Sequence, residues 1–273
     1  MRSVPFHKMH GTGNDFIVLD NMHGQWDLDE LIELTPKICH RRFGVGADGL
    51  LALSPSNDAD YTMIYRNSDG SDAGMCGNGS RCLAMYAHTV AGFSTNLHFR
   101  VHENKYTAHI SGESVTIAFP MTLQVNTIKA SENIEAMFTQ PGNNHIILTE
   151  EEAKDKAGDN VFDLARKLRY DSTVHPDGSN VNIYQKESAD SILLRTYERG
   201  VEDFTYACGT GSIATAVAAH TREHSETTQQ TFQIRSKGGV VSVGFEYDPK
   251  TKQYFKIKLT GPAEFICEGI YAW

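Results

Sequence analysis

Cys76-Gly77-Asn78-Gly79-Ser80 recurs in this chain as Cys208-Gly209-Thr210-Gly211-Ser212, and an apolar, alanine-containing run follows each copy. Both runs read as helices, so each cysteine is predicted to stand at a helix start. The same offset, 208 − 76 = 132, pairs Tyr65 with Tyr197. A repeat this long indicates two copies of one domain rather than a solenoid, whose repeats are several-fold shorter.

A neighbouring offset, 142 − 13 = 129, aligns Gly13-Asn14-Asp15-Phe16-Ile17-Val18 with Gly142-Asn143-Asn144-His145-Ile146-Ile147. We therefore expect an α/β (α+β) protein of two pseudo-symmetric domains, each a mostly antiparallel sheet wrapped around a central helix. The expected domains are residues 1–122 and 123–262, with a strand at 263–273 returning to the first. Each copy supplies one thiol, and the cleft between copies is the natural place for the two thiols to meet.

Local patterns predict the surrounding elements. Helical spacing of apolar residues appears at 27–39 and at 162–168, and short apolar runs at 16–19, 50–53 and 265–271 read as strands. The run at 50–53 follows Gly44-Val45-Gly46-Ala47-Asp48-Gly49. A glycine motif followed by a strand lacks the helix that a dinucleotide fingerprint requires, so no nucleotide cofactor is predicted.

Composition excludes several classes of protein. The chain has 273 residues and a formal net charge of −9, and its basic residues form no extended cluster. Nucleic-acid binding is therefore not expected. No apolar run approaches the roughly 18 residues of a membrane span, and the first residues lack the apolar core of a signal peptide. A cytoplasmic location without membrane partners is the expectation.

The cysteines fall into two groups. Five cysteines in a chain without an export signal argue against a disulfide framework. Cys39, Cys82 and Cys267 have apolar neighbours and are predicted to be small buried hydrophobes. Cys76 and Cys208 instead lie among glycines at symmetry-related helix starts, which favours reactive thiols. The H-x-x-E-H pattern at 220–224 fits a zinc site poorly because it sits at a helix end, and no metal is predicted.

The thiols suggest acid–base chemistry. A helix N-terminus offers unpaired N–H groups and a positive dipole end, which lower the pKa of a thiol and attract a carboxylate. Two such ends would hold one carboxylate and stabilise enolate charge, while the thiols remove and return a proton on opposite faces of the adjacent carbon. That reaction inverts a stereocentre without a cofactor.

The chain resembles the diaminopimelate epimerase family. The resemblance rests on five segments that span nearly the whole chain: Lys8 to Phe16, Arg41 to Gly49, Asn67 to Cys82, Tyr197 to Gly200 and Ala207 to Gly211. It implies an isomerase, independent of pyridoxal phosphate, that interconverts LL- and meso-diaminopimelate in lysine and peptidoglycan precursor biosynthesis. It leaves open which of the two pathways is served, and it is compatible with a homodimer.

The resemblance also implies roles for individual residues. Cys76 and Cys208 would be the catalytic thiols, assisted by His145 near Cys76 and by Glu198, which would alternatively meet the distal ammonium. The reacting carboxylate would rest on backbone N–H groups, and the distal end of the substrate would be held by asparagines and an arginine. The implied binding residues are Asn14, Asn67, Gly77, Asn78, Asn143, Asn180, Glu198, Arg199, Gly209 and Thr210.

Two positions depart from the family pattern. Asn144 stands where the family usually has a proline, which puts the placement of His145 in question. Phe204 stands where many members have a glutamate, so it is expected to alter the polarity of the distal pocket. If Asn144 and Phe204 reshape the pocket, the substrate is another amino acid and not diaminopimelate.

Three other functions are compatible with parts of the sequence. An amino-acid racemase with a different side-chain pocket is the nearest, but a small or aromatic substrate would leave the distal polar groups unpaired. A thiol redox sensor or a pure binding module belongs to another class. Exchange of solvent deuterium into an amino acid distinguishes an epimerase from both.

Overall fold

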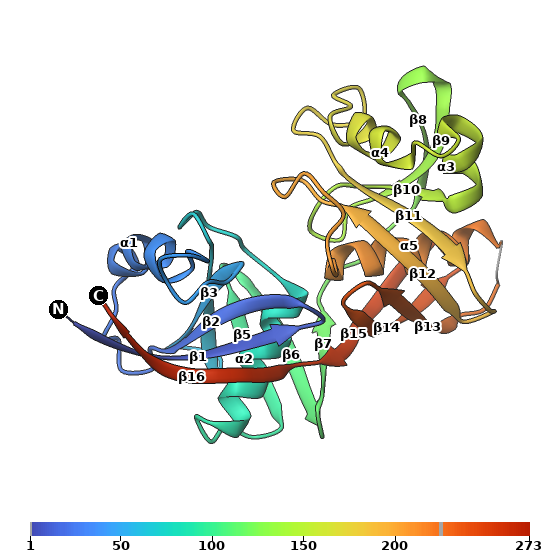
Figure 1. Cartoon of the computed structure of the whole chain (residues 1–273). Helices are drawn as coiled ribbons and strands as arrows, with labels where there is room; N and C mark the ends of the chain where they lie inside the picture. The colour runs from blue at the N-terminus through green and yellow to red at the C-terminus, as the bar shows by residue number, and fades with distance from the viewer. Residues whose placement is uncertain (1, 224–225) are drawn as a thin grey trace. The chain divides into compact units, whose positions relative to one another are not determined.

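The computed structural model describes residues 2–223 and 226–273, and it divides the chain into two compact units. Unit 1 comprises residues 1–120 and 260–273, and unit 2 comprises residues 121–259. The expected boundaries were 122/123 and 262/263. Figure 1 shows the elements of each unit, with the two chain ends together in unit 1.

Unit 1 is a sheet in the order β16-β1-β2-β3-β4-β5-β6-β7, with a central helix, α2, and an outer helix, α1. Its pairs are antiparallel except β2 with β3 and β4 with β5. The elements are β1 (Ser3–Gly11), β2 (Asn14–Asp20), α1 (Leu28–Ile38), β3 (Gly49–Ser54), β4 (Tyr61–Asn67), α2 (Gly77–Thr89), β5 (Asn96–Val101), β6 (Asn104–Ser111), β7 (Ser114–Phe119) and β16 (Glu264–Ala272).

Unit 2 repeats this plan in the order β15-β14-β13-β12-β11-β10-β9-β8, and its parallel pairs are β10 with β11 and β12 with β13. The last residues of β15, from Thr260, belong to unit 1. The elements are β8 (Asn126–Ala130), a 3₁₀ turn (Ser131–Asn133), β9 (Ile134–Thr139), β10 (His145–Thr149), α3 (Glu150–Ala157), α4 (Val161–Arg169), β11 (Asn180–Lys186), β12 (Ser191–Tyr197), α5 (Gly209–Arg222), β13 (Gln229–Ser236), β14 (Gly239–Asp248) and β15 (Gln253–Pro262).

The central helices are buried nearly all round. Every residue of α2 from Gly77 to Ala87, and every residue of α5 from Gly211 to His220, is buried. Sequences this poor in charge are stable as helices only when protein surrounds them. The predicted fold class is confirmed: each unit is a mostly antiparallel sheet around one buried helix.

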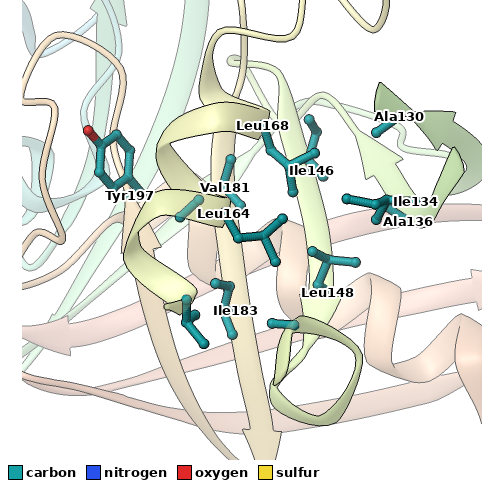
Figure 2. Close-up of a cluster of buried hydrophobic side chains, with 13 residues drawn as sticks. Ala130, Ile134, Ala136, Ile146, Leu148, Leu164, Leu168, Val181, Ile183 and Tyr197 are labelled. Carbon is teal, nitrogen blue, oxygen red and sulfur yellow. The ribbon is translucent and has the colours of Figure 1, made fainter. Parts of the chain in front are cut away.

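The outer face of each sheet carries a second, amphipathic layer. In unit 2, Leu164 and Leu168 of α4 pack on Ile146 of β10 and Val181 of β11, as Figure 2 shows. In unit 1, α1 covers β2 and β3 in the same way through Leu31, Leu34 and Ile38. Strands between two helical layers must be apolar on both faces, and all six residues of β3 are buried.

One prediction about the cysteines is wrong. Cys39 and Cys82 are buried, as expected, but Cys267 is exposed. It lies on β16, which pairs with β1 and forms the edge of the unit 1 sheet. An apolar neighbourhood in sequence does not guarantee burial on an edge strand, because one side of such a strand has no covering neighbour.

Candidate active site

Cys76 and Cys208 occupy equivalent positions at the N-caps of α2 and α5. Their backbone angles nearly coincide, with φ −126° and ψ 117° for Cys76 and φ −124° and ψ 113° for Cys208. Each sulfur accepts the N–H of the third helical residue, at 3.4 Å from Gly79 and 3.3 Å from Gly211. Oxygen side chains usually cap helices in this way. A sulfur so placed is stabilised as a thiolate by that N–H and by the helix dipole.

Asn14 of β2 lies beside Cys76 in unit 1. Its side-chain oxygen is 3.9 Å from Cys76 Sγ and accepts a hydrogen bond of 3.2 Å from Asn78 Nδ2. Its Nδ2 donates to Asp48 Oδ2 at 2.7 Å, which fixes the orientation of the amide because a carboxylate only accepts. The three predicted unit 1 residues Asn14, Cys76 and Asn78 are therefore in contact.

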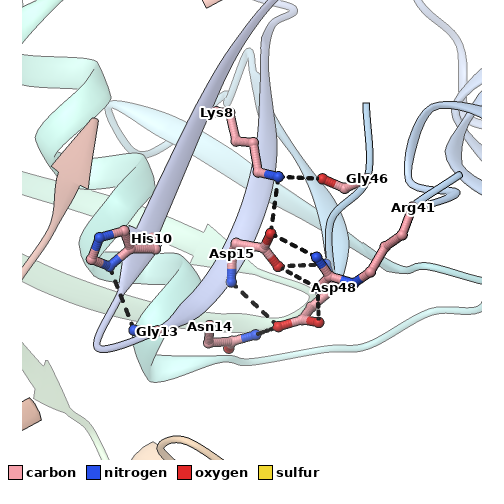
Figure 3. Close-up of polar contacts among 8 residues, drawn as sticks. All are labelled: Lys8, His10, Gly13, Asn14, Asp15, Arg41, Gly46 and Asp48. Carbon is pink, nitrogen blue, oxygen red and sulfur yellow. Dashed lines mark hydrogen bonds and ion pairs between the residues drawn. The ribbon is translucent and has the colours of Figure 1, made fainter. Parts of the chain in front are cut away.

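Asp48, the acceptor of the Asn14 side chain, belongs to a network of charged side chains (Figure 3). Arg41 donates to Asp15 at 2.8 and 3.1 Å and to Asp48 at 2.7 Å, and Lys8 Nζ is 3.1 Å from Asp15 Oδ2. Burial opposes ionisation of Asp15, but the hydrogen bonds from Arg41 and Lys8 outweigh it and lower the pKa of the carboxyl group. Asp15 therefore remains a charged acceptor near neutral pH.

Arg81 is a fully buried cation next to this cluster. Its guanidinium donates only to neutral oxygens: Thr12 Oγ1 at 3.3 Å, Asn78 Oδ1 at 3.0 Å, and the backbone carbonyls of Gly77 and Pro262, both at 3.2 Å. Burial lowers the pKa of Arg81, and the electrostatic interaction with Cys82 and Cys76 opposes this lowering. A buried cation favours the ionised form of a thiol nearby.

Cys208 in unit 2 lies beside a hydroxyl that contacts a buried imidazole. Cys208 Sγ is 3.5 Å from Thr210 Oγ1, which lies 3.0 Å from His145 Nε2. The Nδ1 atom of His145 is 2.9 Å from Asn182 Nδ2. Burial lowers the pKa of His145 to about 3, so the ring is neutral at physiological pH. Cys76 belongs to unit 1 and His145 to unit 2, and their predicted proximity stays a prediction.

The predicted distal residues have different environments. Asn180 accepts the backbone N–H of Arg199 at 2.8 Å, and its Nδ2 is 3.4 Å from His145 Nε2. Arg199 and Asn143 are exposed, and Glu198 is half-buried. Asn67 donates to Ser71 Oγ at 3.1 Å within a turn. The structure thus joins Asn180 to Arg199 within unit 2, whereas the side chain of Asn67 bonds to Ser71 inside its own turn.

The two departures from the family pattern have local explanations. Asn144 accepts a side-chain hydrogen bond of 2.5 Å from Gln140, and its carbonyl accepts the N–H of Asn180 at 2.9 Å. These bonds hold the loop before His145 in the absence of a proline ring. Phe204 packs edge-on against Tyr197 and Phe162, in the apolar cluster of unit 2.

Sequence reasoning missed three buried polar side chains near the cysteines. Arg81 lies five residues after Cys76, Asn182 lies two residues after Asn180 on β11, and Thr196 precedes Tyr197 on β12. The signal for Asn182 was present, because residues two apart on a strand share a face. Nothing in the local pattern distinguishes Thr196 from an ordinary strand residue.

The H-x-x-E-H segment at 220–224 begins at the C-terminal end of α5. Among residues 2–223 and 226–273, no three His, Cys, Asp or Glu side chains are grouped to hold a metal. Both ring nitrogens of His220 have partners, Tyr254 Oη at 2.9 Å and the carbonyl of Thr227 at 3.0 Å. His224 lies outside the described residues.

No helix within the described residues is long and apolar enough to cross a membrane.

Comparison with known proteins gives the family. The family model for diaminopimelate epimerase matches residues 6–126 and 137–266. The chain belongs to the diaminopimelate epimerase family. Diaminopimelate epimerase from Flavobacterium psychrophilum is 36% identical over 97% of this chain and 99% of its own length. The Chlorobaculum tepidum enzyme is 33% identical over 96% and 98%.

Solved structures of other activities share the fold. A PhzF-family phenazine biosynthesis protein from Bacillus anthracis aligns over the full length of both chains with a TM-score of 0.78 and 14% identity. A hydroxyproline epimerase from Agrobacterium vitis aligns over 99% of this chain and 93% of its own, with a TM-score of 0.72 and 16% identity. At such identities the likeness concerns the fold alone.

Proposed function

We propose that the protein is an isomerase that interconverts LL- and meso-diaminopimelate without a cofactor. The observation that carries the proposal is the matched pair of thiol N-caps, Cys76 and Cys208, whose backbone angles agree within a few degrees. The membership of the diaminopimelate epimerase family supports the choice of substrate.

In the proposed reaction, the thiolate of one cysteine removes the α-proton of the amino acid. The electron pair of the broken C–H bond moves into the carboxylate as an enediolate, and the thiol of the other cysteine delivers a proton to the opposite face. The configuration inverts, and the two sulfurs exchange protonation states. General acid–base transfer of this kind requires positioned groups but no electron sink.

The enediolate charge would be stabilised by the first N–H groups of α2 and α5, those of Gly77, Asn78, Gly209 and Thr210. A helix start carries unpaired donors and the positive end of the dipole, so it binds an anion without further charge. These donors are fixed by the helix and do not reorganise during the reaction. Glu198 and His145 remain candidates for assisting the thiols.

Recognition of the non-reacting amino-acid centre would fall to Asn14, Asn67, Asn143, Asn180 and Arg199. A planar guanidinium is suited to a carboxylate, and the hydrogen bond from the backbone of Arg199 to Asn180 supports a common site for this pair. We further propose that the enzyme works in the cytoplasm on a small-molecule substrate alone.

The test is incubation of the protein with LL-diaminopimelate in deuterium oxide, followed by chiral separation and mass measurement. We expect meso-diaminopimelate that carries one deuterium at the inverted carbon, with or without prior chelation of metals. Exchange into proline or hydroxyproline but not diaminopimelate would identify a racemase of another amino acid. Absence of exchange into any amino acid, with thiols that oxidise reversibly, would instead indicate a redox sensor.

A further inference from the structure

A line of buried polar side chains leads from the interior of unit 2 to Cys208. It runs from Thr196 to Asn182 at 2.9 Å, from Asn182 to His145 at 2.9 Å, and from His145 to Thr210 at 3.0 Å. Thr210 Oγ1 ends the line, 3.5 Å from Cys208 Sγ. Thr196, Asn182 and His145 are at most 3% exposed.

The places in unit 1 that match His145 and Asn182 are occupied by the apolar side chains of Phe16 and Leu51, whereas Thr210 is matched by the polar Asn78. Phe16 matches His145 by strand register, because Phe16 pairs with Gly49, the first residue of β3, as His145 pairs with Asn180, the first of β11. The neighbours of the matching glycines differ likewise. A methyl group on Gly211 would meet Thr196 and Asn182, whereas one on Gly79 would meet Leu51 and Met63.

The fold therefore does not require polar groups behind its central helix. Burying hydroxyl, amide and imidazole groups costs free energy unless each is hydrogen-bonded, and an apolar core of the same shape avoids this cost. Unit 1 has apolar side chains at the two matching strand positions, and unit 2 has polar side chains there. A role at Cys208, where the line ends, accounts for the difference.

The hydrogen bonds have a direction. The hydroxyl of Thr196 donates to Asn182 Oδ1, which turns Asn182 Nδ2 toward His145 Nδ1. With Nδ1 accepting, the single proton of the neutral ring is on Nε2 and is donated to Thr210 Oγ1. Asn180 Nδ2 approaches the same Nε2 at the longer distance of 3.4 Å. The hydroxyl proton of Thr210 is then directed at Cys208 Sγ.

We propose that the Thr210 hydroxyl donates a hydrogen bond to the Cys208 thiolate, and that His145, Asn182 and Thr196 are positioning residues that orient this hydroxyl. A hydrogen bond to an ionised acceptor is about twice as strong as one to a neutral acceptor, so the bond favours the thiolate over the thiol. The consequence for epimerisation rests on the proposed function, whereas the hydrogen bond itself does not.

The test measures the reactivity of Cys208 directly in the full-length protein. Iodoacetamide is applied at about pH 6, below the ordinary thiol pKa of about 8.5, and the alkylation rate of each cysteine is followed by peptide mass spectrometry. Thr210→Val, which keeps the shape and removes the hydroxyl, should slow alkylation of Cys208 relative to the exposed Cys267. Loss of about one pKa unit of thiolate stabilisation, partly offset by higher nucleophilicity, corresponds to roughly a fourfold slower rate.

Two variants separate the hydrogen bond from packing. Thr210→Ser keeps the hydroxyl and should restore the rate of Cys208 to within about twofold of the parent. Thr215→Val, on the same helix, removes a buried hydroxyl that has no hydrogen-bond partner among the described residues, and it should leave that rate unchanged. His145→Phe installs the residue of unit 1 at the matching position and should slow Cys208 as Thr210→Val does.

An unchanged or faster rate in Thr210→Val would overturn the proposal, as would a ¹⁵N spectrum that places the His145 ring proton on Nδ1. The outcome is independent of turnover. A protein that shows the expected rates but does not epimerise diaminopimelate would refute the proposed function and keep the hydrogen bond. A protein that epimerises diaminopimelate without the rate difference would refute the hydrogen bond and keep the proposed function.

Discussion

The two cysteines share their backbone geometry but not their environment. Cys76 lies in unit 1 near a buried cation, Arg81, and beside an asparagine that is held by charged side chains. Cys208 lies in unit 2 at the end of a neutral line of hydrogen bonds. The two repeats thus share the backbone conformation at the cysteine, whereas the side chains around the cysteine differ. A charged group lies near the thiol in one unit, and a hydroxyl lies beside the thiol in the other.

The strongest test of the comparison asks whether both thiols are needed. Cys76→Ala and Cys208→Ala should each abolish epimerisation, by roughly 10³-fold or more, because inversion requires a group on each face of the carbon. The deuterium assay measures the loss, and circular dichroism controls for folding. Near-normal turnover in either folded variant would show that a single base suffices.

A second prediction compares the matching glycines. In Gly211→Ala the new methyl group would lie 2.8 Å from Thr196 Oγ1 and 2.9 Å from Asn182 Oδ1, within the buried line of hydrogen bonds. Overpacking of this kind costs about 1–3 kcal/mol. In Gly79→Ala the nearest atom, at 3.1 Å, is the end of the Leu51 side chain, which can move. Denaturant unfolding should therefore show Gly211→Ala to be less stable than Gly79→Ala, and equal stabilities would contradict the comparison.

A third prediction concerns acid. The pKa of His145 is about 3 in the folded protein and 6.5 for the unperturbed group. Between these values the unfolded chain binds the extra proton, so stability from the neutral ring is complete above about pH 6.5 and falls as the pH decreases. The pKa of Asp15 is also lowered, so its contribution has the same sign, but its ordinary value is 3.8 and the contribution is lost at a lower pH than that of His145.

Hydrogen exchange resolves this effect by unit. Peptides of β10 and β11 should lose about 1–2 kcal/mol of protection between pH 6 and pH 4.5, and peptides of β2 and β3 should lose less. In His145→Phe the additional loss should disappear. His220, whose pKa burial also lowers, is common to both proteins and does not affect the difference. The same slope in both proteins would show that His145 is not the source.

The smallest expected effect separates the two ways of stabilising a thiolate. Arg81→Met removes the buried cation of unit 1 and should slow alkylation of Cys76 by roughly fourfold, for the same reason as at Cys208. Cys208 should be unaffected, because Ile213 occupies the place in α5 that Arg81 has in α2. Equal slowing of both cysteines would mean that the charge acts on the whole molecule or that the fold is disturbed.

Much of this organisation could be predicted from the sequence. The repeated pentapeptide gave the two units, their buried helices and the N-cap position of both thiols, because glycine-rich turns and uncharged alanine-containing runs are local signals. The predicted helix at 162–168 corresponds to α4, Val161–Arg169, and the predicted returning strand to β16. The burial of Cys267 was predicted wrongly, since the sequence does not mark β16 as an edge strand.

The amino-acid sequence by itself determined the duplication, the fold class and the position of Cys76 and Cys208 at helix starts, because periodicity and helix-start signals depend on residues close together in the chain. Only the tertiary structure decided what lies behind each thiol. Thr210, His145, Asn182 and Thr196 come from four elements, and they meet because the register of β10, β11 and β12 turns their side chains toward α5. A shift of one residue in any of these pairings would turn a side chain to the other face of the sheet, so no local pattern contains this line.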